Sequence, residues 1–256
     1  MFIESLKLNI KQKIEYKASF IINSINQFFV FFTYYFVIIA LFSRFNNIRG
    51  FSVYEILLCF GIIHFGYATC EALFRGIDRF EDLIIRGDLD RFLVRPRGIL
   101  FQAMCFDIDL IKSFKALQSI IVIIIAIVKL NISWNIFKVI TLILMLISSV
   151  TIFYGIFVLT ASYCFITVQG LEVKNLFTDG GKYLAEYPIK IYSKSIIIFF
   201  TFVIPYGFIN YYPLLYVIGR TNNIIYMFSP LVVVIFLIPC LLAFKIGLKH
   251  YSSTGS

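Results

Sequence analysis

The sequence predicts an all-α membrane protein with six transmembrane helices. Three observations support this fold class. Of the 256 residues 60% are hydrophobic and only 14% are charged, and the mean hydropathy is +0.90, whereas a soluble domain needs a larger share of charged surface. The charged residues also divide the chain into long uncharged runs. A helix needs about 20 apolar residues to cross about 30 Å of hydrocarbon.

Six runs reach or approach that length. They predict spans at about 18–43, 53–74, 110–131, 139–168, 195–217 and 223–246. The third run is short, so Lys112, Lys115 and Lys129 are expected to extend from its ends towards water. No internal repeat or second domain is visible, and the whole chain, 1–256, is expected to form one membrane domain.

Lysine and arginine positions predict the orientation of these spans. With both termini in the cytoplasm, most of the 23 basic residues fall in cytoplasmic segments, as is usual for membrane proteins. The net charge of +9 therefore reflects topology, and no nucleic-acid partner is expected. The first 17 residues have apolar side chains at helical spacing between lysines, which predicts an amphipathic surface helix and not a cleaved signal peptide.

The connection between the second and third spans is unusually charged, with five acids and six arginines between Arg75 and Arg97. Ile77, Phe80 and Ile84 recur at helical spacing within it. A segment that binds lipid head groups should be mainly basic, but this one mixes both signs around an apolar ridge. The pattern favours a short helix that docks on another protein, although a solvated loop on the head groups is the alternative.

Ionisable residues inside the spans are candidates for function. His64 lies in the middle of the second span, where helix packing and proton relay are both possible roles. Glu71 lies at the inner end of the same span, and a salt bridge with Arg75 competes with binding of a substrate cation. In the first span, Asn23, Asn26 and Gln27 form an amide cluster that must face protein or a wet cavity.

Enzymatic chemistry is not expected in this chain. No Ser/His/Asp or Cys/His set converges, and no G-x-x-x-x-G-K-[ST] phosphate loop occurs. The five cysteines have no paired spacing, so neither disulfides nor a metal site is predicted. We therefore expect no catalytic residues, no metal and no cofactor in this chain.

Four blocks of the sequence resemble the permease subunits of ABC-2 type ATP-binding-cassette exporters, in the uncharacterised or viologen-exporter-like branch. The blocks occupy 61–102, 183–194, 199–220 and 247–256 and occur in the expected order. The resemblance implies a permease dimer, with the second permease an identical or a related chain. It also implies two copies of a separate cytoplasmic ATPase that binds ATP and magnesium, and a place in the plasma membrane, in a bacterium. The expected function is export of a hydrophobic or amphiphilic substrate.

The resemblance also assigns roles to residues. The connection after the second span becomes a coupling helix that seats in the ATPase, and the region after the fifth span becomes a re-entrant outer gate. The coupling residues are then Ile77, Asp78, Arg79, Phe80, Glu81, Asp82, Ile84, Arg86, Asp88, Asp90, Arg91 and Phe92. The outer gate is then formed from Tyr206, Phe208, Asn210, Tyr211 and Tyr212. The polar residues of the first two spans described above, Asn23, Asn26, Gln27, His64 and Glu71, are the candidates for the substrate pathway on their own chemistry. An interfacial aromatic belt is the alternative for the tyrosines.

Two further alternatives remain open at the level of sequence. A gradient-driven secondary transporter should show internal repeats and paired intramembrane charges, and neither is evident; a membrane scaffold is the other competitor. The link 170–194 is expected at the cytoplasmic surface, as a second ATPase contact or as a membrane-surface elbow.

Overall fold

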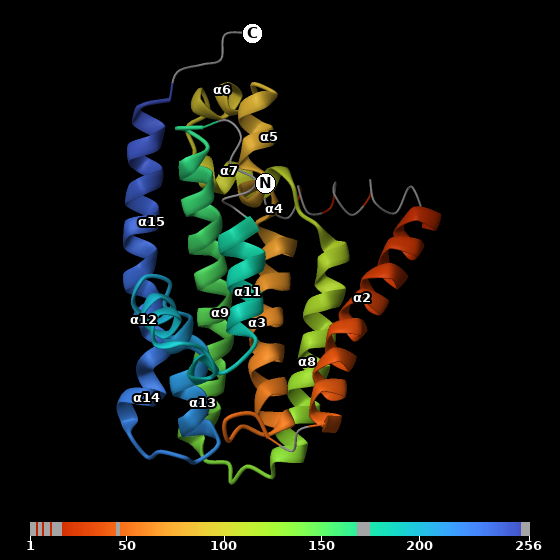
Figure 1. Ribbon diagram of the computed structural model, residues 1–256. Helices are drawn as coiled ribbons and strands as arrows, with labels where there is room; N and C mark the ends of the chain where they lie inside the picture. The colour runs from red at the N-terminus through yellow and green to blue at the C-terminus, as the bar shows by residue number, and fades with distance from the viewer. Residues whose placement is uncertain are drawn as a thin grey trace.

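The computed structural model describes residues 4, 7, 11, 17–44, 47–167 and 175–251. Within them the secondary structure is helical and contains no named strand. Figure 1 shows long helices side by side, with short helices gathered at both ends of the bundle. The helix predicted for the first 17 residues lies largely outside the described residues.

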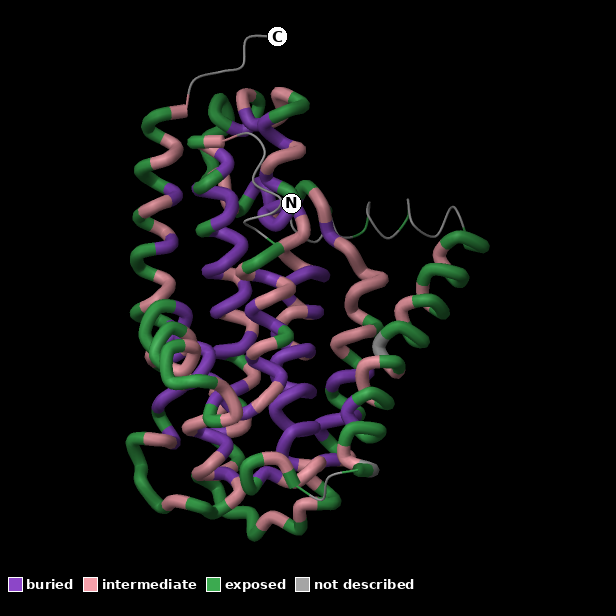
Figure 2. Tube along the Cα trace, in the orientation of Figure 1, coloured by how far each residue is buried: buried purple, intermediate pink, exposed green. Residues whose placement is uncertain are grey.

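Helix α3 (Val53–Leu73) is the centre of the bundle. It begins with a capping box, in which the Ser52 hydroxyl accepts from the backbone N–H of Glu55 and the Glu55 carboxylate accepts from that of Ser52. It packs against α8 (Leu110–Leu130) and α9 (Ile136–Tyr163). Figure 2 shows α3 buried along most of its length. The central helix thus carries side chains that lipid does not reach.

Two glycines let α3 approach its neighbours closely. A Cβ at Gly61 would meet the side chain of Ile123 in α8, and one at Gly66 would meet the backbone of Ser149 in α9. Small residues at crossing points are the usual means by which membrane helices pack tightly.

Within the part of the chain that the structure describes, five helices are long and apolar enough to cross a membrane, or six if one bent pair counts as a span. Besides α3, α8 and α9 these are α2 (Lys17–Arg44) and the α14–α15 stretch, in which α14 is Ile224–Phe228, η4 is Ser229–Leu231 and α15 is Val232–Lys249. Helices therefore occur at the places of the first four predicted spans and of the sixth. Helix α2 diverges from α8 towards the end of the bundle that carries α5 (Phe80–Ile85) and α6 (Asp88–Leu93) (Figure 1).

The fifth predicted span, 195–217, is not one straight helix. Helix α12 (Lys194–Phe202) ends before Pro205, and a π-helical turn η3 (Gly207–Tyr211) followed by α13 (Tyr212–Val217) continues at an angle of 85°. Proline lacks the backbone N–H that an unbroken helix needs. The residues after the bend lead to the end of the bundle where α13 and α14 lie (Figure 1).

The link expected at the cytoplasmic surface instead runs along α3. Its described part consists of a π-helical turn η1 (Leu176–Gly180), α11 (Gly181–Ala185) and a short 3-10 turn η2 (Ile189–Ile191). Glu186 hydrogen-bonds to His64 in the middle of α3, and the Lys190 carbonyl accepts from Arg49 just before α3 begins. The surface-elbow interpretation is therefore wrong for residues 175–190, because polar partners inside the bundle accommodate them.

The end opposite α13 and α14 carries four short helices between α3 and α8: α4 (Arg75–Asp78), α5 (Phe80–Ile85), α6 (Asp88–Leu93) and α7 (Ile99–Phe106). Gly87 adopts φ 70° and separates α5 from α6, as a residue without a Cβ can. Asp88 is thus the first residue of α6 and not its N-cap. A Cβ at Gly76 would collide with the Ala103 carbonyl oxygen of α7, so α4 and α7 lie in close contact.

Candidate functional site

Two adjoining polar cavities lie between α3 and the η1–α11 segment. The one nearer α4 and α5, which we call the acidic cavity, has a volume of about 390 Å³. The second, which we call the lysine cavity, has a volume of about 290 Å³ and reaches His64. Tyr67, Glu71 and Asp179 line both, so the two cavities adjoin at these side chains.

Glu71 is the hub of an ion-pair network at this junction. Its Oε1 lies 3.3 Å from the Arg75 guanidinium and 3.3 Å from the Lys112 ammonium. Arg75 also binds Asp78 at 2.6 Å. Burial disfavours the charge on Arg75, but the Asp78 and Glu71 carboxylates outweigh this effect and raise the pKa of the guanidinium. The predicted salt bridge between Glu71 and Arg75 is therefore confirmed, as part of a larger network.

Lys182 of α11 is buried and paired. Its ammonium lies 3.0 Å from Asp179 and over the rings of Tyr67 and Tyr183, at 4.4 and 4.6 Å from their centroids. A desolvated cation gains from both partners, the carboxylate and the ring faces. The Tyr67 hydroxyl in turn donates to Asp179 at 3.3 Å.

His64 is held in a buried pair. Its Nε2 lies 2.9 Å from Glu186, and both side chains are less than a tenth exposed. The imidazole and the carboxyl group are both ionisable, so the two side chains can share one proton across this hydrogen bond. Nearby, the Tyr34 hydroxyl of α2 lies 2.9 Å from that of Tyr183. These contacts join α2, α3 and α11 at the lysine cavity.

The predicted coupling residues divide into two groups. The ridge Ile77, Phe80 and Ile84 is at most 2% exposed and points into the bundle, where the Phe80 ring packs against Phe165 and Phe244. The expectation that this ridge docks on another protein is wrong, because α9 and α15 offer an apolar surface inside the same chain. Buried with it are Asp78 and Phe92.

A different apolar set faces outwards at this end. Ile85, Leu93 and Val94 are 58%, 45% and 84% exposed. The arginines exposed in the same segment are Arg79, Arg86, Arg91, Arg95 and Arg97, and its partly exposed acids are Glu81, Asp82, Asp88 and Asp90. We call the surface of Ile85, Leu93, Val94 and these arginines the arginine-rimmed face.

The predicted gate residues also separate. Phe208, Tyr211 and Tyr212 gather near the α13–α14 end, where Tyr212 contacts both other rings and Tyr226. Tyr206 is instead buried against Phe153 and Phe200 at the bend.

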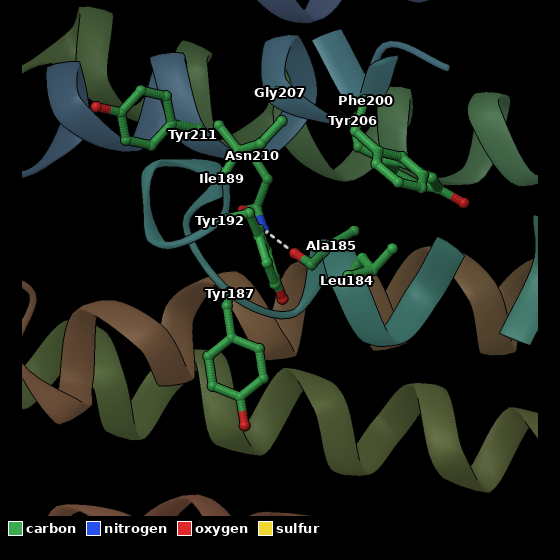
Figure 3. Close-up of a pocket in the computed structure, with 10 residues that line it drawn as sticks. All are labelled: Leu184, Ala185, Tyr187, Ile189, Tyr192, Phe200, Tyr206, Gly207, Asn210 and Tyr211. Atoms are coloured by element: carbon green, nitrogen blue, oxygen red, sulfur yellow. Dashed lines mark hydrogen bonds between the residues drawn. The ribbon is translucent and has the colours of Figure 1, made fainter. Parts of the chain in front are cut away.

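Like Tyr206, Asn210 is separate from the ring cluster of Phe208, Tyr211 and Tyr212. Figure 3 shows it among the residues that line a small pocket, with its amide donating to the Ala185 carbonyl at 2.7 Å. Through this bond η3 is fastened to the end of α11. At the far end of α13, the Arg220 guanidinium binds both oxygens of Glu55 at 2.7 and 2.8 Å and the Gly50 carbonyl at 2.7 Å.

The amide cluster of α2 does not line either cavity. Asn23 and Asn26 are exposed in the single chain, and Asn23 only donates to Ser19 within its own helix. Gln27 is half-buried. From α2 the lysine cavity receives Val30 and Tyr34 instead.

Several residues of the site were not predicted, above all Tyr67, Lys115, Asp179, Lys182 and Glu186. The signal that could have found them is the charge pattern of 179–186, in which one acid, one lysine and a second acid recur at helical spacing. That spacing places them on one side of a helix, where they can face α3. Within the described residues no group of three or more His, Cys, Asp or Glu side chains could hold a metal ion.

The comparisons with known proteins agree with a transport role. A family model described as ABC-2 family transporter protein matches residues 28–255. No curated protein and no solved structure matches the chain. Since the match covers nearly the whole sequence, with its long apolar helices, the chain belongs to the ABC-2 family of transporter proteins, as a multi-pass membrane component.

Proposed function

We propose that this chain is the transmembrane subunit of an ABC exporter that moves an amphiphilic or hydrophobic substrate out of the cytoplasm. A separate ATPase subunit, in two copies, binds ATP and magnesium and drives the cycle. Family membership is the observation that carries this proposal. Both termini lie in the cytoplasm and the protein resides in a bacterial plasma membrane, in keeping with the excess of lysine and arginine in the segments assigned to that side.

The α4–α6 end is the ATPase-docking end in this proposal. The arginine-rimmed face combines exposed apolar side chains with charge, which suits a groove of complementary charge on a partner. Behind it, Phe80 anchors α5 to Phe165 and Phe244. A displacement of α5 by the ATPase is therefore passed to α9 and α15 as a rigid-body movement.

Six crossings of the membrane follow if the η1–α11–η2 segment counts as the fifth. It passes from Asp179 near the inner end of α3 to Lys190 beside Arg49. The bent α12–η3–α13 unit is then the re-entrant element on the outer side, as broken helices are tolerated where protein covers them. Lys190 and Lys194 move to the outer side in this arrangement, and the cytoplasmic excess of basic residues remains.

Helix α2 supplies the contact with a second permease, identical or related. Only 6% of its most apolar window is buried in the single chain, and its exposed side includes Asn23 and Asn26. Amide side chains are costly against lipid, so another protein surface must cover them.

A gradient-driven transporter is the second candidate. The expectation that the chain lacks paired charges at membrane depth is wrong, since Lys182 pairs with Asp179, and His64 is hydrogen-bonded to Glu186 nearby. Such pairs occur in proton-coupled carriers. Family membership nevertheless favours the ATP-driven mechanism, and the experiment below separates the two.

The test is purification of the tagged chain from its native membrane in mild detergent, with mass spectrometry of stoichiometric partners and an ATPase assay. We expect an ATPase subunit in fixed ratio, and its loss from the double variant Leu93→Asp and Val94→Asp. Ile224→Asp is the matched control, because Ile224 is 63% exposed at the opposite end of the bundle. A wild-type chain that purifies alone, or an ATPase retained by the double variant, would contradict the proposal.

A further inference from the structure

We infer that the two adjoining cavities bind the zwitterionic head group of an amphiphile, with its cationic group in the acidic cavity and its anionic group at Lys115. The inference rests on the proposed function and specifies the chemistry of its substrate. It is drawn from the charged side chains that line the two cavities and from which of these side chains form ion pairs with one another.

The acidic cavity has a surplus of carboxylates. Its lining includes two guanidinium groups, of Arg75 and Arg79, against five carboxylates, of Glu71, Asp78, Glu81, Asp82 and Asp179. Arg75 is shared between Glu71 and Asp78, and Arg79 pairs with Asp82 at 3.2 Å. Glu71 and Asp179 also pair with Lys112 and Lys182, so Glu81 is the lining carboxylate that makes no ion pair with a described residue, and a cationic group entering here meets its charge.

The lysine cavity has the opposite imbalance. Three ammonium groups line it, and two of them are paired, Lys112 with Glu71 and Lys182 with Asp179. The third, Lys115, makes no ion pair with any described residue, although it is only partly exposed. An ammonium withdrawn from bulk water without a partner is costly, so an anionic ligand group is the complement that the cavity lacks.

The junction of the cavities also lacks a donor. Glu71 is 5% exposed, and its Oε2 has no hydrogen-bond partner among the described residues. Of the nearby tyrosines Tyr67 lines both cavities, and its ring already lies 4.4 Å from the Lys182 ammonium. One ligand with both charges, a few bonds apart, satisfies Lys115 on one side of Glu71 and the carboxylates on the other.

The surroundings accept an apolar tail. Val30 and Tyr34 of α2 form one wall of the lysine cavity. The same helix leaves Phe28 and Phe29 exposed, at 48% and 65%. A tail attached to a bound head group can therefore lie against α2 while the head group stays among the charges, which favours an amphiphile over a small solute.

The experiment measures binding to the purified chain in an uncharged detergent. The probes are dioctanoyl phosphatidylethanolamine, which carries both charges, dioctanoyl phosphatidic acid, which lacks the amine, and dodecyltrimethylammonium, which lacks the anion. We expect the zwitterion to bind at least about tenfold more tightly than either single-charge probe, since each charge adds a charge-assisted contact.

Two variants assign the two ends of the head group. Lys115→Gln should weaken both phosphate-bearing probes about tenfold and leave the cation unchanged. It breaks no ion pair, so the fold is expected to persist. Glu71→Gln should weaken the zwitterion and the cation but not phosphatidic acid. Lys129→Gln, at the exposed opposite end of α8, is the matched control and should change nothing.

The outcomes discriminate clearly. Equal affinity for zwitterion and phosphatidic acid, or affinities that neither Lys115→Gln nor Glu71→Gln changes, would overturn the inference. Competition by glycerophosphoethanolamine, the head group without tails, would support the site but assign it to a soluble zwitterion. Because binding is measured without transport, failure here leaves ATPase co-purification intact, whereas failure of the proposed function removes the ATPase and not the binding.

Discussion

The crossing of α3 and α9 depends on Gly66, and Gly66→Ala is the sharpest test of the bundle. A Cβ at this position would lie 2.5 Å from the backbone carbon of Ser149 and 2.5 Å from its Oγ. Ser149 is fully buried, and its hydroxyl already donates to the Leu146 carbonyl at 2.7 Å. The obstacle is therefore helix backbone, which cannot rotate away.

The cost follows from that distance. Ordinary carbon contacts are about 3.5 Å, so the two helices must separate by about 1 Å at the crossing. Overpacking of this kind costs about 2–3 kcal/mol, which lowers the melting temperature of a chain of this size by about 5–10 °C. Gly61→Ala should cost less, since the nearest atom there, Ile123 Cγ1 at 2.6 Å, belongs to a side chain that can change rotamer.

The assay uses the five cysteines of the chain, all of which are free and buried. A fluorogenic thiol reagent stays dark on the folded protein and reports unfolding as the temperature rises. Gly98→Ala is the control, because nothing lies within 4 Å of a Cβ there. We expect the melting temperature to be highest for Gly98→Ala, lower for Gly61→Ala and lowest for Gly66→Ala. Equal melting of Gly66→Ala and Gly98→Ala would refute the close crossing.

Three further changes probe other contacts. Arg220→Ala leaves the buried Glu55 carboxylate without its guanidinium partner and should lower the free energy of unfolding by about 2 kcal/mol, with faster proteolysis of the α13–α14 connection. Proteolysis at the wild-type rate would contradict a stabilising role for this ion pair. Glu186→Ala leaves the buried His64 without its hydrogen-bond partner and should lower the melting temperature more than Glu186→Gln, which keeps a hydrogen bond. Equal melting temperatures of the two variants would argue against the pair. Phe80→Ala removes a ring that is 1% exposed and should cost about 3–4 kcal/mol, while the co-purified ATPase loses its response to substrate; an unchanged response would exclude Phe80 as the link.

The parts of the fold that were predictable are those governed by hydropathy alone. Helices α2, α3, α8 and α9 occupy long apolar runs, and the break at Pro205 follows from a missing backbone donor. The run 175–190 failed the same criterion because Asp179, Lys182 and Glu186 interrupt it. Their cost is met by Tyr67 and His64, partners that are distant in the sequence and therefore invisible to a window of neighbours.

The candidate site was predictable in its residue types more than in its arrangement. Glu71 and Arg75 are four residues apart, so local spacing sufficed for their salt bridge. Helical spacing also grouped Ile77, Phe80 and Ile84 correctly on one side of the chain. It could not say which way that side faces, since an apolar ridge suits a partner's groove and the protein's own core equally well. Only the presence of Phe165 and Phe244 decides the matter.

The same contacts explain how events at the ATPase-docking end could reach the cavities. Arg75 is the first residue of α4 and joins Asp78, in the same helix, to Glu71, in α3 and in the shared wall of the cavities. A movement of α4 that brings the Arg75 guanidinium closer to Glu71 weakens the hold of Glu71 on Lys112. Lys112 would then join Lys115 as a second unpaired ammonium, so the affinity of the lysine cavity for an anionic group changes with the position of α4. In the proposed exporter, a short chain of ion pairs would thus connect the arginine-rimmed face with the proposed binding cavities, without any rearrangement of α3 itself.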